Sequence, residues 1–324
     1  MAETRLTNAV IPEVFTGYTA EQSIYKARLF RSGVVEQNGG ISNLLSGGGE
    51  TFNLPFWQDI GGTSGDVPVE GTDQDINNMA AAKQVFRRHS RTKAWGTNDL
   101  VKVYAGSNPL ESLQNMVIDY WANAFDIMTI ASAQGAFAAE AGLVNDQNAV
   151  NFSDSLVIDT QALLGENGTV GRGDLNGGDF VAIAVHPSVY AYMRKNDLID
   201  FVPISGQPRP VATYMGMDVI VSGNMPEDDG VYNTYIFKQN AFQYGMSTVG
   251  YEPTEIDRKP GDGFGIDALH TRRVFGIHPV GFAWQEDNIA GVTPTDAELR
   301  TSTEWDLVFN AENARMVALK HTIA

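Results

Sequence analysis

The 324-residue chain contains no cysteine. Disulfide bonds, thiolate nucleophiles and zinc sites with cysteine ligands are therefore excluded. Long apolar runs are also missing: no window of about 18 uninterrupted apolar residues exists, so we expect no membrane-spanning helix. The first residues, Met1 to Thr16, include Glu3, Arg5 and Glu13 and lack the apolar segment of a signal peptide. We therefore expect a protein that is made in the cytoplasm.

Positive charge is scarce in this chain. It has 22 Lys+Arg against 39 Asp+Glu, which gives a formal net charge of −17. Because nucleic-acid binding needs clustered cations, we expect no sequence-specific binding of DNA or RNA. An acidic protein would suit the wall of a container that holds DNA without gripping it, although acidity also aids solubility in general.

Signatures of catalysis and of metal binding are also missing. There is no nucleophile elbow and no phosphate-binding loop. Asp73–Asn78 begins like a calcium loop, but it lacks glycine at the sixth position, and Gln84 stands where the bidentate glutamate belongs. The histidines show no metal-binding spacing; they are His89, His186, His270, His278 and His321. We therefore expect no catalytic residue, no metal site and no cofactor.

What the sequence does contain begins with an N-terminal stretch and a protruding hairpin. A helical pattern from about Ala20 to Phe30 and a glycine-rich passage show no core of their own, which is typical of an arm. Thr51–Phe56 then alternates apolar and polar residues, and Pro55 predicts an edge or bulged strand. Lys83–Trp95 predicts the return strand. The loop between them is far longer than a compact hairpin needs, so we expect an ordered, protruding hairpin.

The strongest local prediction is a long helix. Asn108 is a candidate N-cap, Pro109 occupies the first helical position, and Glu111 completes a capping-box spacing. Apolar residues then recur at helical intervals from Leu110 to Phe137. At 1.5 Å per residue, this segment would span about 40 Å.

The second half of the chain predicts a mixed α/β domain followed by late strands. The segments for the domain are a helix at Ser155–Leu164, a strand at Phe180–Val185, a helix at Val189–Arg194, and strands at Met217–Val221 and Tyr232–Phe237. The late strands are Arg272–Trp284 and Trp305–Lys320, separated by a polar loop.

This order of features resembles the tailed-phage major capsid proteins of the Hong Kong 97 phage-type fold, over nearly the whole chain. Four segments carry the local likeness: Ile11–Phe15, His186–Tyr190, Tyr214–Ser222 and Arg272–Trp284. The resemblance implies an α+β fold with an N-terminal arm, an extended β-hairpin loop, a long spine helix, and peripheral and axial domains. The implied ranges are the arm at 1–46, the hairpin loop at 47–98, the peripheral domain with the spine helix at 99–142, the axial domain at 143–270, and the return to the peripheral domain at 271–324.

The resemblance also implies a function. Pentamers and hexamers would build an icosahedral shell around packaged double-stranded DNA, in a virion made in the host bacterial cytoplasm. A separate scaffolding protein, a portal and a decoration protein are the implied partners. An encapsulin-type nanocompartment, which has the same fold and holds a cargo enzyme, is one alternative, and an α/β enzyme with dispersed site residues is another.

Candidate contacts between subunits follow from the hairpin. A lone two-stranded hairpin is marginal in water, so we expect it to bury its apolar residues on an adjacent subunit. The return strand also carries a basic run, Lys83, Arg87, Arg88, Arg91 and Lys93. A nucleic-acid contact is one interpretation, but no stacking platform of several aromatics accompanies the run, so it favours a solvated strand face or pairing with acidic patches on neighbours. The expected contact residues are Phe52, Leu54, Phe56, Trp57, Arg87, Arg88, Arg91 and Lys93.

Overall fold

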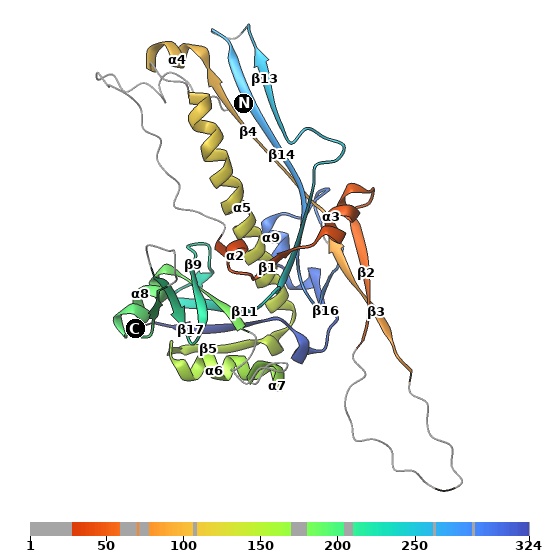
Figure 1. Cartoon of the computed structure of the whole chain (residues 1–324), viewed down its shortest axis with the longest axis vertical. Helices are drawn as coiled ribbons and strands as arrows, with labels where there is room; N and C mark the ends of the chain where they lie inside the picture. The colour runs from red at the N-terminus through yellow and green to blue at the C-terminus, as the bar shows by residue number, and fades with distance from the viewer. Residues whose placement is uncertain are drawn as a thin grey trace.

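The computed structural model describes residues 28–58, 70, 78–105, 109–169, 180–203, 210–261, 264–286 and 289–323. Helices and strands are mixed throughout this part of the chain, which confirms the α+β class. Figure 1 shows a layered body that contains one sheet, a long narrow sheet that extends from it beside one helix, and a hairpin that projects away from both. The helices are α2 (Arg28–Arg31), α3 (Gly39–Ser46), α4 (Asp99–Ala105), α5 (Pro109–Ala139), α6 (Asp154–Gln161), α7 (Glu166–Thr169), α8 (Pro187–Lys195) and α9 (Asp296–Leu299).

Helix α5 is the predicted long helix, and its 31 residues connect the two sheets. It begins at Pro109 as expected, while the candidate N-cap Asn108 lies outside the described residues. In its first half, Trp121 donates from Nε1 to Thr271 Oγ1 on the long sheet over 3.1 Å. In its second half, Ile130 and Phe137 belong to the main core. The helix thus reaches from one sheet to the other, as Figure 1 shows.

The eight-stranded sheet has the order β5-β17-β11-β6-β9-β8-β7, with β10 paired to β11. It is mixed, because β6 and β9 run parallel whereas β11 runs antiparallel to both β6 and β17. Its strands are β5 (Val144–Asn151), β6 (Phe180–Val185), β7 (Asp200–Val202), β8 (Val211–Tyr214), β9 (Met217–Val221), β10 (Glu227–Asp228), β11 (Val231–Lys238) and β17 (Met316–Thr322).

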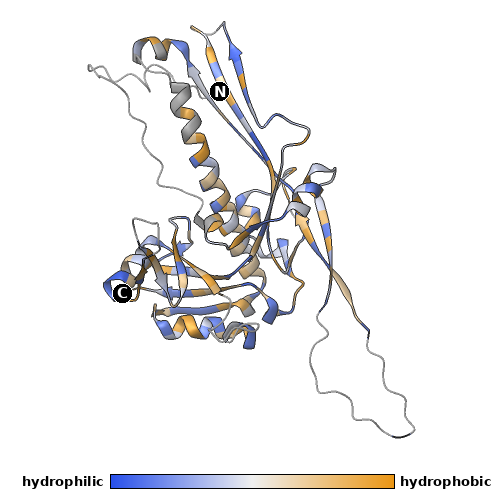
Figure 2. Cartoon of the chain, in the orientation of Figure 1, coloured by the Kyte–Doolittle hydropathy of each residue, from blue (hydrophilic) through white to orange (hydrophobic). Residues whose placement is uncertain are grey.

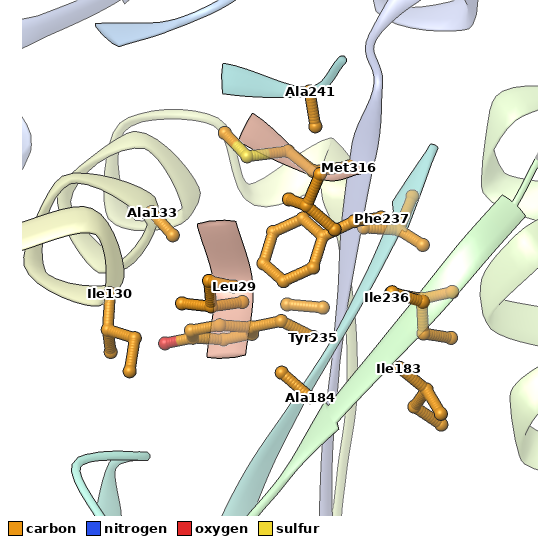
Figure 3. Packing of buried hydrophobic residues seen from close by; sticks show 14 of the residues in the cluster. Leu29, Ile130, Ala133, Ile183, Ala184, Tyr235, Ile236, Phe237, Ala241 and Met316 are labelled. Atoms are coloured by element: carbon orange, nitrogen blue, oxygen red, sulfur yellow. The ribbon is translucent and has the colours of Figure 1, made fainter. Parts of the chain in front are cut away.

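The main core lies on the central strands of this sheet. Ile183 on β6 and Ile236 on β11 face each other in register, and both are fully buried. Figure 3 shows side chains from α2, α5 and β17 packed around the same strands, including Leu29, Ile130 and Met316. Burial of a side chain of this kind stabilises the fold by about 1.5–3 kcal/mol relative to exposure. Leu29 therefore anchors α2 in the core of the molecule.

The long sheet is organised by β14 (Ile266–Pro279). One edge of β14 pairs with β4 (His89–Asn98), and the other pairs first with β13 (Thr254–Lys259) and then with β12 (Phe242–Ser247). β1 (Val35–Gln37) adds to β12 in parallel. Hydrophobic and hydrophilic residues alternate along this sheet in Figure 2, as expected where only one face is packed.

The two sheets do not follow the predicted chain ranges strictly. β12 and β13 fall within the range predicted for the axial domain, yet they pair with β14. Conversely, β17 falls within the predicted return to the peripheral domain but pairs with β11 and β5. The domain boundaries themselves stay a prediction.

The projecting hairpin consists of β2 (Thr51–Trp57) and β3 (Ala81–Arg87). Among the described strands β2 pairs with β3 alone, so the predicted edge position of Pro55 is confirmed. The single return strand predicted over Lys83–Trp95 was wrong. The chain leaves β3 at Arg88, whose N–H donates to Glu50 O, and then continues as β4 in a different sheet.

The two late strands were also divided. The segment predicted as Arg272–Trp284 is the end of β14 followed by β15 (Phe282–Trp284), because Gly281 turns the chain at a φ of +93°. The segment predicted as Trp305–Lys320 is β16 (Trp305–Leu307) and β17, separated by a one-turn helix at Ala311–Asn313. Of β16 and β17, only β17 joins the eight-stranded sheet, whereas β16 pairs with β15.

Candidate assembly surfaces

The inner face of the hairpin packs on α3 of the same subunit. Phe52 and Leu54 are partly buried against a small cluster formed by Ile41, Leu45 and Phe86. This cluster is separate from the main core. The hairpin is therefore packed against its own subunit at this point. Only the part of Phe52 and Leu54 that stays accessible could contact another subunit.

Further along the hairpin the apolar residues become more accessible. The Phe56 ring packs edge-on against Phe309, with 4.7 Å between centroids. Trp57, on the opposite face of β2, is 67 % exposed, and Met79 at the start of the return is also exposed. Aromatic residues are enriched at protein interfaces relative to the rest of the surface, so an exposed indole on a projecting hairpin favours contact with a protein.

The basic run lies where the hairpin joins the long sheet, and most of it is paired within the subunit. Arg87 is only 4 % exposed and forms ion pairs with Glu50 (3.2 Å) and Glu286 (2.9 Å). Arg91 pairs with Asp296 over 3.3 Å. Solvation of a strand face, one of the two expected roles, therefore does not describe Arg87.

Arg88 and Lys93 differ in whether they are bound within the subunit. Arg88 donates to the carbonyl oxygens of Leu45 and Gly47 at the end of α3. Lys93 is exposed on β4. Of the predicted contact residues, Trp57 and Lys93 are thus the most accessible ones, and the role of all eight as contacts between subunits stays a prediction.

The far end of the long sheet carries exposed apolar residues that the sequence reasoning missed. Val103 and Tyr104 on α4 are exposed, as are Ile256 on β13 and Phe264 in the turn before β14. Arg258 bridges Asp99 and Asp267 and so ties α4 to the sheet. In the sequence these residues lie in segments about 150 positions apart, so no local pattern indicated that they share one end of the molecule.

Two histidines are buried at the base of the hairpin. His89 and His278 are both about 1 % exposed, and the His278 ring stacks on Phe86 with 4.0 Å between centroids. Burial, together with the nearby positive charges of Arg91 and Arg87, lowers the pKa of His89 to about 3. Burial also lowers the pKa of His278 to about 4, although its hydrogen bond with Phe282 O acts in the other direction. Both rings are therefore neutral packing elements at neutral pH.

The remaining histidines whose contacts are defined have structural roles as well. His186 caps α8 by accepting a hydrogen bond from Ser188 N at Nδ1. His321 Nε2 lies 2.9 Å from Thr234 Oγ1, and burial lowers its pKa. In the part of the chain that the structure describes, no group of three or more His, Cys, Asp or Glu side chains is arranged to hold a metal ion. None of the described helices is long and apolar enough to cross a membrane.

Comparison with known proteins shows which proteins share this architecture. No family model matches the chain. The chain is 29 % identical over 338 residues to a protein named Major capsid protein from Bacillus phage SPP1, and the match covers 100 % of this chain and 99 % of that protein. The capsid of Ralstonia phage GP4 has a similar structure, with a TM-score of 0.62 at 10 % identity over 97 % of this chain and 96 % of that one.

The chain has the tailed-phage capsid fold of the Hong Kong 97 phage type. The expected resemblance to tailed-phage major capsid proteins is confirmed over the full length of the chain. The SrpI encapsulin complex of Synechococcus elongatus shares this capsid fold, with a TM-score of 0.53 at 8 % identity over 94 % of this chain and 91 % of that one. That likeness concerns the fold alone, so the encapsulin alternative is weaker. The expectation of a structural protein rather than an enzyme is confirmed by these relatives.

Proposed function

We propose that this protein is the major capsid subunit of a tailed bacteriophage, and that its copies assemble as pentamers and hexamers into an icosahedral shell. The observation that carries the proposal is the full-length similarity to a phage major capsid protein, in a chain whose structure has the capsid fold. The subunit itself is also suited to assembly, because its hairpin projects from the body with an exposed Trp57 at the edge of the described part.

The shell encloses packaged double-stranded DNA in this proposal. The formal net charge of −17 supports a wall that holds DNA without binding it tightly. Most of the basic run also supports this view, since Arg87, Arg88 and Arg91 are engaged with partners in their own subunit. The subunit would be made in the host bacterial cytoplasm and end in the virion.

Contacts between copies are proposed to run through the hairpin. Trp57 would bury its exposed ring on an adjacent subunit, and the remaining accessible surface of Phe52, Leu54 and Phe56 would contribute from the other face of β2. Lys93 would meet acidic side chains of a neighbour. Desolvated aromatic anchors of this kind commonly dominate the energetics of an interface.

Further partners complete the proposal. A scaffolding protein would guide curvature, a portal would occupy one vertex, and a decoration protein would bind outside the finished shell. These follow from the capsid function, and no particular residue is assigned to them.

Electron microscopy of the purified protein tests the function directly. We expect closed shells, or rings of the size of pentamers and hexamers, when the protein is expressed alone or together with its scaffolding protein. A protein that stays monomeric under both conditions would contradict the proposal. Particles that hold a co-purified enzyme and contain no DNA would favour the encapsulin alternative, which shares the fold.

A further inference from the structure

The backbone at the base of the hairpin does little to fix the direction in which the hairpin points. Three consecutive glycines, Gly47, Gly48 and Gly49, lead into β2, and a Cβ on Gly48 would meet nothing within 4 Å. Glycine has the widest choice of backbone conformations. On the other side, β3 and β4 are separated by Arg88 alone. Side-chain contacts at the base therefore help to set the angle between the hairpin and the long sheet.

Arg88 connects the hairpin to α3. Its Nη2 donates to Leu45 O over 2.8 Å and to Gly47 O. Carbonyl groups at the C-terminal end of a helix carry partial negative charge, which favours a cation there. The guanidinium carbon also lies 5.3 Å from the centre of the Phe52 ring on β2, within the range of a cation–π contact. One side chain thus contacts α3, the glycine run and β2.

Arg87 connects the hairpin to the C-terminal part of the chain. Its Nη1 pairs with Glu50, which precedes β2, and with Glu286, which follows β15. Its Nη2 donates to Val292 O over 2.9 Å. Because a buried cation without partners is strongly unfavourable, these contacts hold the loop around Glu286 and Val292 against the base of the hairpin.

Both arginines also have a buried Nε atom with no hydrogen-bond partner among the described residues. An unsatisfied buried donor has a cost in free energy, so this arrangement is not fully optimised for the isolated subunit.

We infer that Arg87 and Arg88 are positioning residues for assembly, which hold the hairpin at one angle to the long sheet and thereby set how neighbouring subunits meet. The inference rests on the proposed function, because the angle matters only where the hairpin contacts another copy. It differs from the expected direct contact of these residues with neighbours, since here they act within their own subunit.

Hydrogen–deuterium exchange of the soluble subunit, followed by electron microscopy of its particles, tests the inference. In Arg88→Gln and Arg87→Gln we expect exchange at residues 51–57 and 81–87 to accelerate about tenfold or more, since each change removes hydrogen bonds made by a charged group. Exchange in β6 and β11 should stay as in the wild type. Particles of these variants should be open sheets, tubes or shells of mixed diameter.

Three further variants sharpen the test. Glu50→Gln combined with Glu286→Gln removes both carboxylates from Arg87 at side chains that are 64 % and 42 % exposed, while the amide oxygens can still accept from its guanidinium, so it tests the ion pairs with Arg87 in place. Arg88→Lys keeps the charge without the fork that reaches two carbonyl groups, and should fall between wild type and Arg88→Gln. Lys195→Gln, an exposed charge at the end of α8, is the matched control and should change neither readout.

The outcomes separate the inference from the proposed function. Unchanged hairpin exchange in both Arg88→Gln and the double glutamine variant would overturn the inference. So would variants whose hairpin exchange is unchanged but whose particles fall apart more readily, because that result indicates direct contact with neighbours. If the wild type forms no particles at all, the proposed function fails. The exchange data on the soluble subunit still decide whether Arg87 and Arg88 hold the hairpin in place.

Discussion

Gly135 of α5 lies directly against Trp305, the first residue of β16. A Cβ placed on Gly135 would come within 2.5 Å of the indole Nε1 and within 2.0 Å of Leu299 O. These two atoms form a hydrogen bond of 2.8 Å with each other. The absence of a side chain at Gly135 therefore allows the C-terminal part of the chain to close over the long helix.

Gly135→Ala should destabilise the subunit, although alanine normally favours a helix. The new methyl group would separate Trp305 from Leu299, and overpacking of this kind lowers the free energy of unfolding by about 3 kcal/mol. Gly39→Ala in α3 is the matched control, because a Cβ there would meet nothing within 4 Å. Urea unfolding of both variants checks the prediction, which is wrong if the two substitutions have the same effect.

Acid should loosen the base of the hairpin through its two buried histidines. Both rings have a folded-state pKa well below their ordinary 6.5, about 3 for His89 and about 4 for His278. The unfolded chain therefore binds protons that the folded chain does not. The stability that the two neutral rings contribute is fully present above pH 6.5. It is lost as the pH falls from 6.5 toward 4 for His278 and toward 3 for His89. Near pH 4.5 we expect a loss of about 2–3 kcal/mol for each ring, because that pH lies two units below the ordinary pKa.

Urea unfolding of the soluble subunit at about pH 7.5 and about pH 4.5 measures this loss. Carboxylates also contribute to the pH dependence, so the useful quantity is the difference between wild type and a variant with His89→Gln and His278→Gln. The variant should be less stable at neutral pH because packing is disturbed, yet it should lose less stability on acidification. An equal loss in both proteins would show that the two rings do not carry the effect.

Trp57 should matter for assembly and not for folding. Its ring is 67 % exposed in the subunit, so Trp57→Ala removes little that the folded chain uses. If the ring is an anchor between copies, its loss should weaken association by about 2 kcal/mol or more, which is roughly 30-fold. Val249→Ser, an exposed apolar residue after β12, is the control. Light scattering during assembly and thermal unfolding of the subunit separate the two effects.

Ile183 should be among the residues most sensitive to truncation. It is fully buried on β6 between the neighbouring strands β11 and β9 (Figure 3). Ile183→Ala should lower the free energy of unfolding by about 2–5 kcal/mol, through lost burial and the cavity left behind. Ile158→Ala on the outer side of α6, where the side chain is exposed, should change it by much less. Similar losses in both variants would contradict the burial assigned to Ile183.

Several elements could be predicted from the sequence because their cause is local. The long helix was predicted over Leu110–Phe137 and extends from Pro109 to Ala139, since helical spacing of apolar residues is a property of the segment itself. The strand at Met217–Val221 was predicted with the same bounds as β9. Short apolar runs between turns carry this information in their composition.

Interruptions of strands could not be predicted in the same way. Lys83–Trp95 has an unbroken strand pattern, and nothing in it shows that Arg88 separates β3 from β4. The break depends on Glu50 and on β14, which are distant in the sequence. The roles of Arg87 and Arg88 were hidden for the same reason, since their partners Glu286 and Leu45 lie far along the chain on either side.

The sequence by itself determined the class of protein: an acidic chain without cysteine, with one very long helix, a hairpin with an unusually long loop, and an order of segments similar to that of phage capsid proteins. The tertiary structure decided which charged residues are free and which are already paired. It also gathered Val103, Tyr104 and Phe264 at one end of the molecule. Periodicity and composition act over neighbouring residues, whereas burial and ion pairing depend on segments that only the folded chain brings together.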